Sequence, residues 1–248
     1  MISENERFTI LDAVESTNNY AMAKAHAGLA VHEHAWFARE QWGGKGQRGN
    51  SWLSEKDENI LMTVILKPNK VFRSNMFLFN AVVACSCHQF FSHIAGSATY
   101  LKWPNDIYYN DKKAGGILIE NIFSNNEWSW AAVGIGINVN QVNFDSGNTN
   151  AISLSTICNK VFNPLELAKK LHEHLINNFR QISSIGEEYY FNYYNNHLYK
   201  KNETVKLKKD NMVFSTCIKE VNRNGQLITF DVMERQFNSG EIRWVVEV

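Results

Sequence analysis

The sequence lacks the features that mark membrane, exported and nucleic-acid-binding proteins. Its 25 Lys and Arg residues balance 25 Asp and Glu residues, so no net charge would attract nucleic acid or an anionic membrane. No run approaches the roughly 20 apolar residues that a membrane helix needs, and the first residues, MISENERFTI, have neither a cationic start nor an apolar stretch. We therefore expect a soluble cytoplasmic protein with no nucleic-acid and no membrane partner.

Cysteine is scarce as well. Cys85, Cys87, Cys158 and Cys217 show no CxxC spacing, and the first two lie in an apolar pattern of helical period. This arrangement predicts buried free thiols rather than disulfides or a zinc site, and we assign no metal ligands. The 248 residues suffice for one large domain, or for a large and a small one.

The stretch KWPNDIYYNDKKAGGILIE at residues 102–120 holds a high density of residues that could bind a ligand or take part in catalysis. Apolar residues alternate with polar ones through 98–103, which predicts a strand, Asn110-Asp111 suits a turn, and 117–119 predicts a second strand. Lys102, Asp106 and Lys113 would then lie at one end of a small sheet. The alternative is that Asp106 only shapes a turn and that the lysines are solvated surface charges.

A second candidate site is the loop QWGGKGQRGNSW at residues 41–52. Its glycines let the backbone approach a ligand closely, and Lys45 and Arg48 can neutralise a phosphate or a carboxylate. The loop is neither a Walker A sequence nor a GxGxxG dinucleotide fingerprint. A flexible surface linker is the alternative, but such linkers seldom carry tryptophans like Trp42 and Trp52.

Two weaker signals come from helix and strand patterns. Ser16 or Thr17 suits the N-cap of a helix that ends near Gly28, where capping alone would explain the hydroxyl. In the strand WSWAAVGIGINV at 128–139, Gly134 and Gly136 share one face, where a flat ligand could lie. Asn138 lies on that face too, unless it only ends the strand.

The remaining segments are expected to be structural, with no candidate site residues. The run NILMTVIL at 59–66 predicts a strand buried on both faces, and Ser74 is the expected cap of a helix through Ile94. Further helices are expected from Asn163-Pro164 and over 187–199, with a polar loop between 141 and 155. From about residue 202, four short alternating segments predict a small β-barrel.

Taken together, these motifs resemble those of the biotin protein ligases. The family has a Ser-Thr-Asn stretch, a Gly/Arg-rich loop ending in tryptophan, KWPND, a lysine before G-I-L-[VI]-E, and a G-x-G-x-N strand. The corresponding segments here are Ser16-Thr17-Asn18, residues 43–52, Lys102 to Asp106, Lys113 with 116–120, and 134–138. The five motifs stand in the family order, and the resemblance covers essentially the whole chain.

The resemblance implies an α/β fold with a mixed sheet flanked by helices, related to class II aminoacyl-tRNA synthetases. It implies a catalytic domain at residues 1–200 and a small Src-homology-3-like barrel at 201–248. It also implies that ATP, with Mg²⁺, converts biotin to biotinyl-5′-AMP, and that biotin then passes to a lysine of a biotin carboxyl carrier protein. Whether the protein forms a homodimer is left open.

The resemblance also implies roles for individual residues. The catalytic residues would be Lys113, Asp106 and Lys45. Biotin would contact Ser16, Thr17, Asn18, Gln41, Gly44, Lys45, Gly46, Gln47, Arg48, Lys113 and Gly116. ATP or the adenylate would contact Arg48, Trp52, Lys102, Asn105, Lys113, Gly134, Gly136 and Asn138. Asp106 would orient or deprotonate the incoming acceptor lysine.

This chain departs from the family pattern in its Gly-rich loop. Where many members read GRGRRGR, Lys45, Gln47 and Asn50 replace arginines, so bidentate guanidinium contacts are lost there. We expect residues 42–52 to be mobile without ligand and to order over biotinyl-AMP, unless the tryptophans and Arg48 already hold the loop. No DNA-binding winged helix precedes the catalytic region, so no repression is expected.

Two other functions fit the same motifs. A lipoate or octanoate ligase would share the fold and the adenylation chemistry, although KWPND and the Gly-rich loop favour biotin. A non-catalytic biotin-binding regulator would keep the pocket but lose the reactive geometry, which the presence of Lys113 and Asp106 disfavours. Pyrophosphate exchange separates these possibilities.

Overall fold

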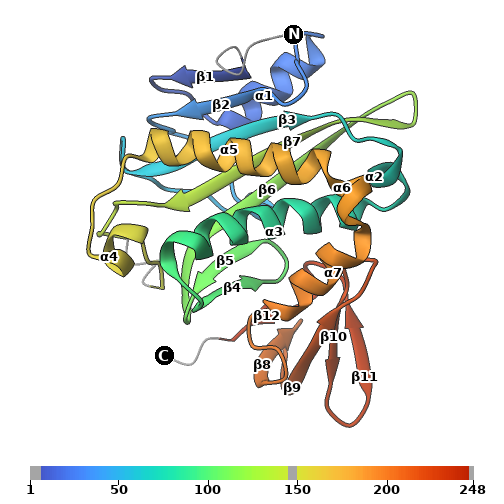
Figure 1. Cartoon of the computed structure of the whole chain (residues 1–248). Helices are drawn as coiled ribbons and strands as arrows, with labels where there is room; N and C mark the ends of the chain where they lie inside the picture. Colours follow the sequence, from blue (N-terminus) through green and yellow to red (C-terminus); the bar gives the residue numbers. More distant parts are fainter. Residues whose placement is uncertain (1–6, 145–149, 246–248) are drawn as a thin grey trace.

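The computed structural model describes residues 7–144 and 150–245, and these residues form a large mixed sheet and a small antiparallel sheet (Figure 1). The large sheet has the order β1-β2-β3-β7-β6-β5-β4, in which only β1 and β2 run parallel. Its strands are β1 (Phe8–Leu11), β2 (Ala35–Ala38), β3 (Asn59–Leu66), β4 (Thr99–Lys102), β5 (Asp106–Tyr109), β6 (Lys112–Ser124) and β7 (Glu127–Asn138). The mixed sheet predicted from the sequence is confirmed.

Helices cover both faces of this sheet. The α-helices are α1 (Thr17–His26), α2 (Lys70–Ser74), α3 (Met76–Ala95), α4 (Leu154–Cys158), α5 (Pro164–Arg180), α6 (Ile182–Ile185) and α7 (Glu187–Asn196). Helices α3 and α5 lie side by side across one face and bury the main core (Figure 1). Helix α1 packs on the other face against β2, β3 and β7, and leaves the rest of that face open.

The expected cap of the long helix was wrong by one residue. Ser74 ends α2, and its hydroxyl donates to the carbonyl of Val71 at 2.8 Å. The N-cap of α3 is Asn75, whose backbone is extended and whose Oδ1 accepts from the amide of Leu78 at 3.0 Å. The error is physical in origin, because serine and asparagine both cap helices well and only the backbone decides which one does.

The middle of the 102–120 stretch also differs from expectation. The predicted strand at 98–103 is β4, but a further strand, β5, stands between it and the turn at Asn110. Asn110 has φ 49° and connects β5 to β6, which extends over 13 residues. The segment is therefore a three-stranded meander rather than one hairpin.

The small C-terminal sheet has the order β11-β10-β9-β8-β12 within the described residues. Its strands are β8 (Thr204–Lys209), β9 (Met212–Val221), β10 (Leu227–Phe230), β11 (Glu234–Phe237) and β12 (Arg243–Trp244). The four expected segments become five strands, because the Asp231 side chain accepts from the amides of Val232 and Met233 and turns the chain there. A second β unit is confirmed, whereas its closure into a barrel and a domain boundary at 200/201 stay predictions.

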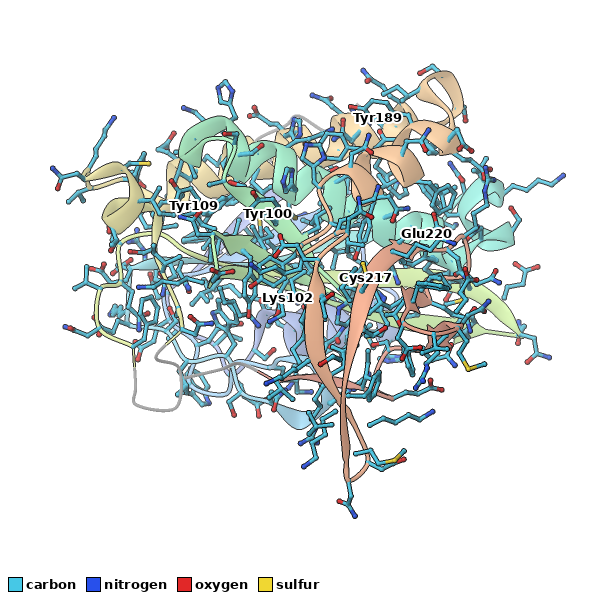
Figure 2. The ribbon with its side chains drawn as sticks, turned by 90° about the horizontal axis from the view of Figure 1, so that it is seen from below. Tyr100, Lys102, Tyr109, Tyr189, Cys217 and Glu220 are labelled. Carbon is cyan, nitrogen blue, oxygen red and sulfur yellow. The ribbon has the colours of Figure 1, made fainter. Side chains whose placement is uncertain are left out.

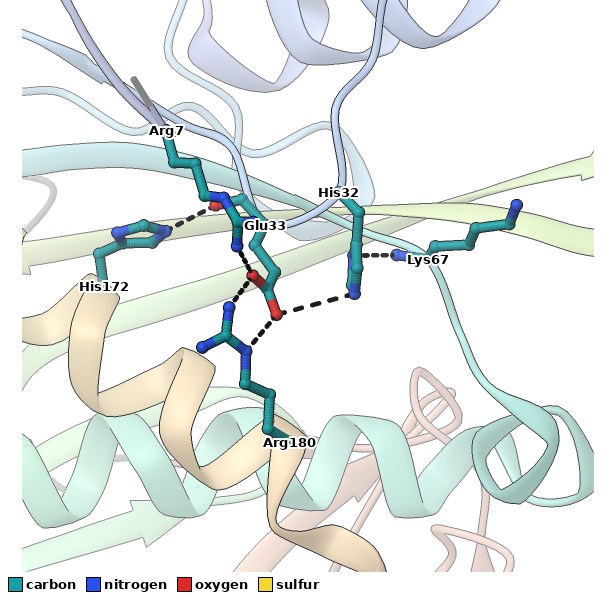
Figure 3. A network of polar contacts seen from close by, with 6 residues as sticks. All are labelled: Arg7, His32, Glu33, Lys67, His172 and Arg180. Carbon is teal, nitrogen blue, oxygen red and sulfur yellow. Dashed lines mark hydrogen bonds and ion pairs between the residues drawn. The ribbon is translucent and has the colours of Figure 1, made fainter. Parts of the chain in front are cut away.

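A buried ionic network joins the start of β2 to helix α5 (Figure 3). Glu33 is 4% exposed and pairs with both Arg7 and Arg180, and its backbone carbonyl accepts from His172 at 2.7 Å. Burial opposes ionisation of Glu33, but Arg180, His32 and Arg7 together hold its pKa below the usual range. The network ties the N-terminal edge of the sheet to the helical layer.

Two further expectations concern thiols and membranes. All four cysteines are free, as predicted, but only Cys85 and Cys87 are buried, whereas Cys158 and Cys217 are partly exposed. Burial raises the pKa of the Cys87 thiol to about 12. Among the described residues, no helix has both the length and the apolar character needed to span a bilayer. Residues 145–149 of the polar loop expected at 141–155 lie outside the described residues.

Candidate active site

The open face of the large sheet carries a patch without side chains. Along β7, Val133, Ile135 and Ile137 point into the core beneath α3 and α5, so Gly134 and Gly136 face the opposite side. The predicted sharing of one face by the two glycines follows from this alternation. The bare patch is the floor of the site.

Strand register extends this floor across the sheet. Gly136 pairs with Leu61 on β3 and with Gly116 on β6, and Gly116 pairs with Asp106 on β5. Residues in register on neighbouring strands point to the same side. The register therefore places the Asp106 carboxylate at the edge of a nearly bare strip of backbone.

A cavity opens above the floor, lined by segments that are far apart in the sequence. Of the predicted site residues, it brings together Ser16, Thr17, Asn18, Gln41, Lys45, Gly46, Gln47, Arg48, Trp52, Asn105, Asp106, Lys113, Gly116, Gly134 and Gly136. It does not include Gly44, Lys102 or Asn138. The convergence of most of the predicted residues on one cavity makes it the candidate active site, although the role of each residue stays a prediction.

Lys113 and Asp106 form the charged centre of the cavity. The Lys113 Nζ lies 2.7 Å from Asp106 Oδ1 and 5.7 Å from the centre of the Trp52 ring. The two side chains are 31% and 20% exposed, so solvent reaches both. A partly desolvated ammonium paired with a single carboxylate can turn towards an anionic ligand and leave that carboxylate free.

The backbone around Lys113 is fixed from both sides. Its amide donates to the carbonyl of Asn150 at 2.7 Å, and the amide of Ile152 donates to its carbonyl at 2.9 Å. Asn138 is buried and donates to the carbonyls of Lys113 and Ile152. Asn138 thus holds the backbone of Lys113, and its predicted contact with an adenylate would require this amide to exchange partners.

Asn105 fixes the turn that carries Asp106. Its Nδ2 donates to the carbonyl of Ile117 at 2.6 Å, and the amide of Ile117 donates to the carbonyl of Asn105 at 2.9 Å. This reciprocal pair binds the turn between β4 and β5 to strand β6. Asn105 lines the cavity while its amide is already engaged.

The N-terminus of α1 borders the opposite end of the cavity. Ser16 caps the helix through the amide of Asn19, which confirms the capping prediction for Ser16 rather than Thr17. The amide of Thr17 donates to Gln41 Oε1 at 2.6 Å, so the Gln41 side chain is held across the gap between the helix and the loop. The hydroxyl, amide and backbone groups gathered here are suited to a small polar ligand.

Both ends of the Asn18 side-chain amide are already hydrogen-bonded to other residues of the protein. Its Oδ1 accepts from Thr63 Oγ1 at 2.6 Å, and its Nδ2 donates to Glu120 at 2.8 Å. A Cβ on Gly134 would overlap the Asn18 amide. A glycine at 134 therefore leaves room for the Asn18 side chain as well as keeping the floor open. The sequence does not indicate this contact between Gly134 and Asn18.

The Gly-rich loop is folded over the cavity. Gly46 donates to Asn50 at 2.7 Å and Trp52 donates to Gly44 at 2.8 Å through the backbone, while Lys45 Nζ donates to Asn19 Oδ1 at 2.6 Å. A Cβ on Gly44 would overlap the Trp52 carbonyl, which explains the glycine without a ligand contact. The expected mobility of residues 42–52 stays a prediction, and these bonds are what an opening loop must break.

Trp52 occupies the floor where a flat ligand was expected. A Cβ on Gly136 would lie 2.6 Å from Cε2 of the Trp52 indole, and one on Gly116 would lie 3.2 Å from Cζ3. The glycine pair therefore seats an aromatic ring of this chain. A ligand ring would have to lie against or beside that indole.

Lys102 lies next to the C-terminal sheet (Figure 2), and in the large sheet it pairs with Asp106 across β4 and β5. Its Nζ donates to the Tyr108 hydroxyl at 2.9 Å and lies 4.2, 5.4 and 5.0 Å from the rings of Tyr108, Tyr199 and Trp244. Burial lowers the pKa of Lys102 to about 8. The ammonium is thus enclosed by aromatic rings, and its predicted contact with the adenylate stays a prediction.

The sequence did not indicate the contribution of the C-terminal sheet. Gly240, Ile242 and Trp244 line the same cavity as Lys113, together with Trp103 and Pro104. No motif marks these C-terminal residues, because more than 100 residues separate them from the strands they meet.

The residues that line the cavity provide few ligands for a metal ion that binds without a nucleotide. Within 7–144 and 150–245, no three His, Cys, Asp or Glu side chains cluster as a metal site. Asp106 is the one carboxylate residue among the described lining residues. This fits Mg²⁺, which typically takes one or two carboxylates, waters and the phosphates of its substrate.

Comparisons with known proteins show which proteins this chain is similar to. The model of the biotin/lipoate A/B protein ligase family matches residues 11–138, which hold the floor, the Gly-rich loop and the Lys113–Asp106 pair. A biotin--[acetyl-CoA-carboxylase] ligase of Paracoccus denitrificans is 35% identical over 133 residues, covering 52% of this chain and 53% of that protein. A bifunctional ligase/repressor BirA of Bacillus spizizenii is 36% identical over 108 residues, covering 44% of this chain and 33% of that protein.

The fold has a solved counterpart. A biotin protein ligase from Aquifex aeolicus, in complex with biotin and ATP, matches with a TM-score of 0.81 and 23% identity over 96% of this chain and 98% of that one. At this identity the match establishes the fold. The curated relatives above match over about a third to a half of their own length.

Proposed function

The chain belongs to the biotin/lipoate A/B protein ligase family, and we propose that it activates biotin with ATP and transfers it to a lysine of a biotin carboxyl carrier protein. The observation that carries the proposal is the convergence of Lys113, Asp106 and the Gly-rich loop on one cavity over a bare floor. The name of the relative from Paracoccus denitrificans, a biotin--[acetyl-CoA-carboxylase] ligase, supports biotin as the substrate.

In the first step, a biotin carboxylate oxygen would bond to the α-phosphorus of ATP. The bond from that phosphorus to the bridging oxygen would break, and pyrophosphate would leave with the electron pair. Two anions must be brought together while charge grows on the phosphoryl oxygens, so positioned cations matter most. Lys113 lies in the cavity with a single carboxylate partner, and Lys45 lies in the loop above it.

In the second step, the amine of an acceptor lysine would attack the acyl carbon of biotinyl-AMP. The amine loses a proton, the carbon–oxygen bond to the phosphate breaks, and AMP leaves. We assign Asp106 to orient that amine or to accept its proton. It becomes available when Lys113 turns from its carboxylate to the phosphate, so the ion pair links the two steps.

The ends of the cavity differ in character, and this orients the substrates. The polar end at Ser16, Thr17 and Gln41 offers hydroxyl and amide groups, which suit the ureido ring of biotin. The end at Trp52 offers an aromatic surface to the adenylate. Lys113 lies near Trp52, at the end where the acyl phosphate bond must form.

Magnesium would enter with the nucleotide and supply positive charge to the leaving phosphates. Asp106 is the described lining residue that could contribute a carboxylate oxygen to it. The protein steps described above depend on Lys113 and Asp106 themselves.

The test is ATP-dependent pyrophosphate exchange with each acid in turn. Biotin should support the exchange, and biotin should then appear on the lysine of a carrier domain. Exchange with lipoate or octanoate but not with biotin would overturn the substrate assignment. Biotin binding without any exchange would favour a non-catalytic regulator.

A further inference from the structure

The Gly-rich loop contacts the C-terminal sheet through the side chain of Arg48. The Arg48 guanidinium reaches across and donates to the Ser239 hydroxyl at 2.9 Å. Ser239 lies in the turn at 238–240, between β11 and β12. Arg48 itself has φ 59°, a left-handed backbone conformation, and its guanidinium lies against the Ser239–Gly240 turn.

Gly240 completes this contact. A Cβ at Gly240 would overlap the guanidinium of Arg48, and Gly240 has φ +98°, where side chains are disfavoured. The guanidinium therefore lies flat against bare backbone beside the serine hydroxyl. The contact depends on shape as well as on one hydrogen bond.

The turn that receives Arg48 is braced from within the C-terminal sheet. The amide and side chain of Asn238 donate to the Glu241 carboxylate at 3.1 and 2.9 Å, and Gln226 donates to Asn238 Oδ1 at 3.2 Å. Beyond the turn, Ile242 and Trp244 line the cavity. The same short segment thus forms part of the cavity wall and receives the loop.

We propose that the Ser239–Gly240 turn is a positioning element that holds the Gly-rich loop closed over the cavity through Arg48. The proposal rests on the proposed function, because the ligand that the closed loop would retain is the biotinyl-AMP formed there. Arg48 then acts on the protein and not on biotin: its guanidinium binds the C-terminal turn and keeps residues 45–52 above the ligand. The C-terminal sheet sets how long the reactive intermediate is retained.

The first test measures hydrogen exchange in the ligand-free protein at the amides of Gly46, Asn50 and Trp52. Ser239→Ala should raise their exchange about threefold to tenfold, the effect of one modest hydrogen bond, and Ser239→Thr should restore it. Ser184→Ala removes another exposed serine hydroxyl, which donates to Gln181, and serves as the control. It should leave exchange in the loop unchanged.

A second variant acts through shape. Gly240→Ala should displace Arg48 and raise the same exchange rates, whereas Gly96→Ala places a Cβ at nearly the same φ, +95°, with no atom within 4 Å. The Gly96 variant therefore controls for backbone strain. Exchange that is unchanged by both Ser239→Ala and Gly240→Ala relative to their controls overturns the proposal.

The last test measures biotinyl-AMP released into solution during turnover without a carrier. Ser239→Ala should raise the release relative to the rate of adenylation, with Ser239→Thr close to the wild type. Unchanged release with faster loop exchange would refute the role in retaining the intermediate. If the wild type makes no biotinyl-AMP, the proposed function fails, yet the exchange experiment still decides whether the turn holds the loop.

Discussion

A methyl group placed on the cavity floor should unseat Trp52. The change is Gly136→Ala, whose Cβ would lie 2.6 and 2.7 Å from Cε2 and Cζ2 of the indole, where ordinary contacts measure 3.4–4 Å. The indole must therefore move away from the sheet by about 1 Å. Strand β7 itself should tolerate the change, because alanine is at least as favourable as glycine inside a strand.

The size of the loss in activity depends on how easily the Trp52 side chain can move. Overpacking costs about 1–3 kcal/mol where neighbours are fixed, but Trp52 is only partly buried and sits at the cavity. We therefore expect about 1–1.5 kcal/mol, which is about a 5- to 13-fold loss of kcat/KM for ATP. The free energy of unfolding should change much less.

The assay is biotin-dependent pyrophosphate exchange, performed in wild-type and Trp52→Ala backgrounds. If Gly136→Ala acts by displacing the indole, it should cost little once the indole is absent, which a double-mutant cycle measures directly. An equal loss in both backgrounds would refute the reasoning. It would mean that the methyl group obstructs the ligand itself.

Three further predictions follow from the same structure. Lys113→Ala should slow adenylation by about 10²- to 10³-fold by removing a positioned charge, yet affect transfer from pre-made biotinyl-AMP less; equal losses in both half-reactions would show that the lysine is misassigned. Gln47→Arg should slow the escape of biotinyl-AMP, measured by labelling of bystander lysines, because a planar cation clamps an anionic ligand better than an amide; unchanged escape would remove Gln47 from the explanation. Glu33→Gln should lower stability to denaturant at pH 7. Because the folded-state pKa of Glu33 lies below its usual 4.5, the difference from wild type should be present above that pH and vanish as the pH falls through the folded-state pKa; a difference independent of pH would contradict the ionic origin.

Local patterns were sufficient for much of the fold. The buried run 59–66 is β3, and Asn163-Pro164 opens α5 with the Asn163 side chain accepting from two amides of the first turn. The alternation in β7 put Gly134 and Gly136 on one face. Each of these depends on a few adjacent residues and on a period of 2.0 or 3.6, which sequence displays directly.

The failures lie where distant segments meet. Nothing near Gly136 indicates that its face holds Trp52, and nothing near Lys102 indicates an enclosure that includes Trp244. Ser74 and Asn75 could both have capped a helix, and the extended backbone at Asn75 makes that residue the cap. The family motifs gathered most of the cavity residues, but they do not separate a residue that touches a ligand from one, such as Asn138, that holds a neighbour's backbone.

The most direct test of the central claim is transfer of biotin to a carrier domain with purified protein, ATP and magnesium, followed with streptavidin. We expect labelling of one acceptor lysine that requires both biotin and ATP and is lost when that lysine is replaced by arginine. Absence of labelling, together with no pyrophosphate exchange in the presence of biotin, would contradict the proposed reaction.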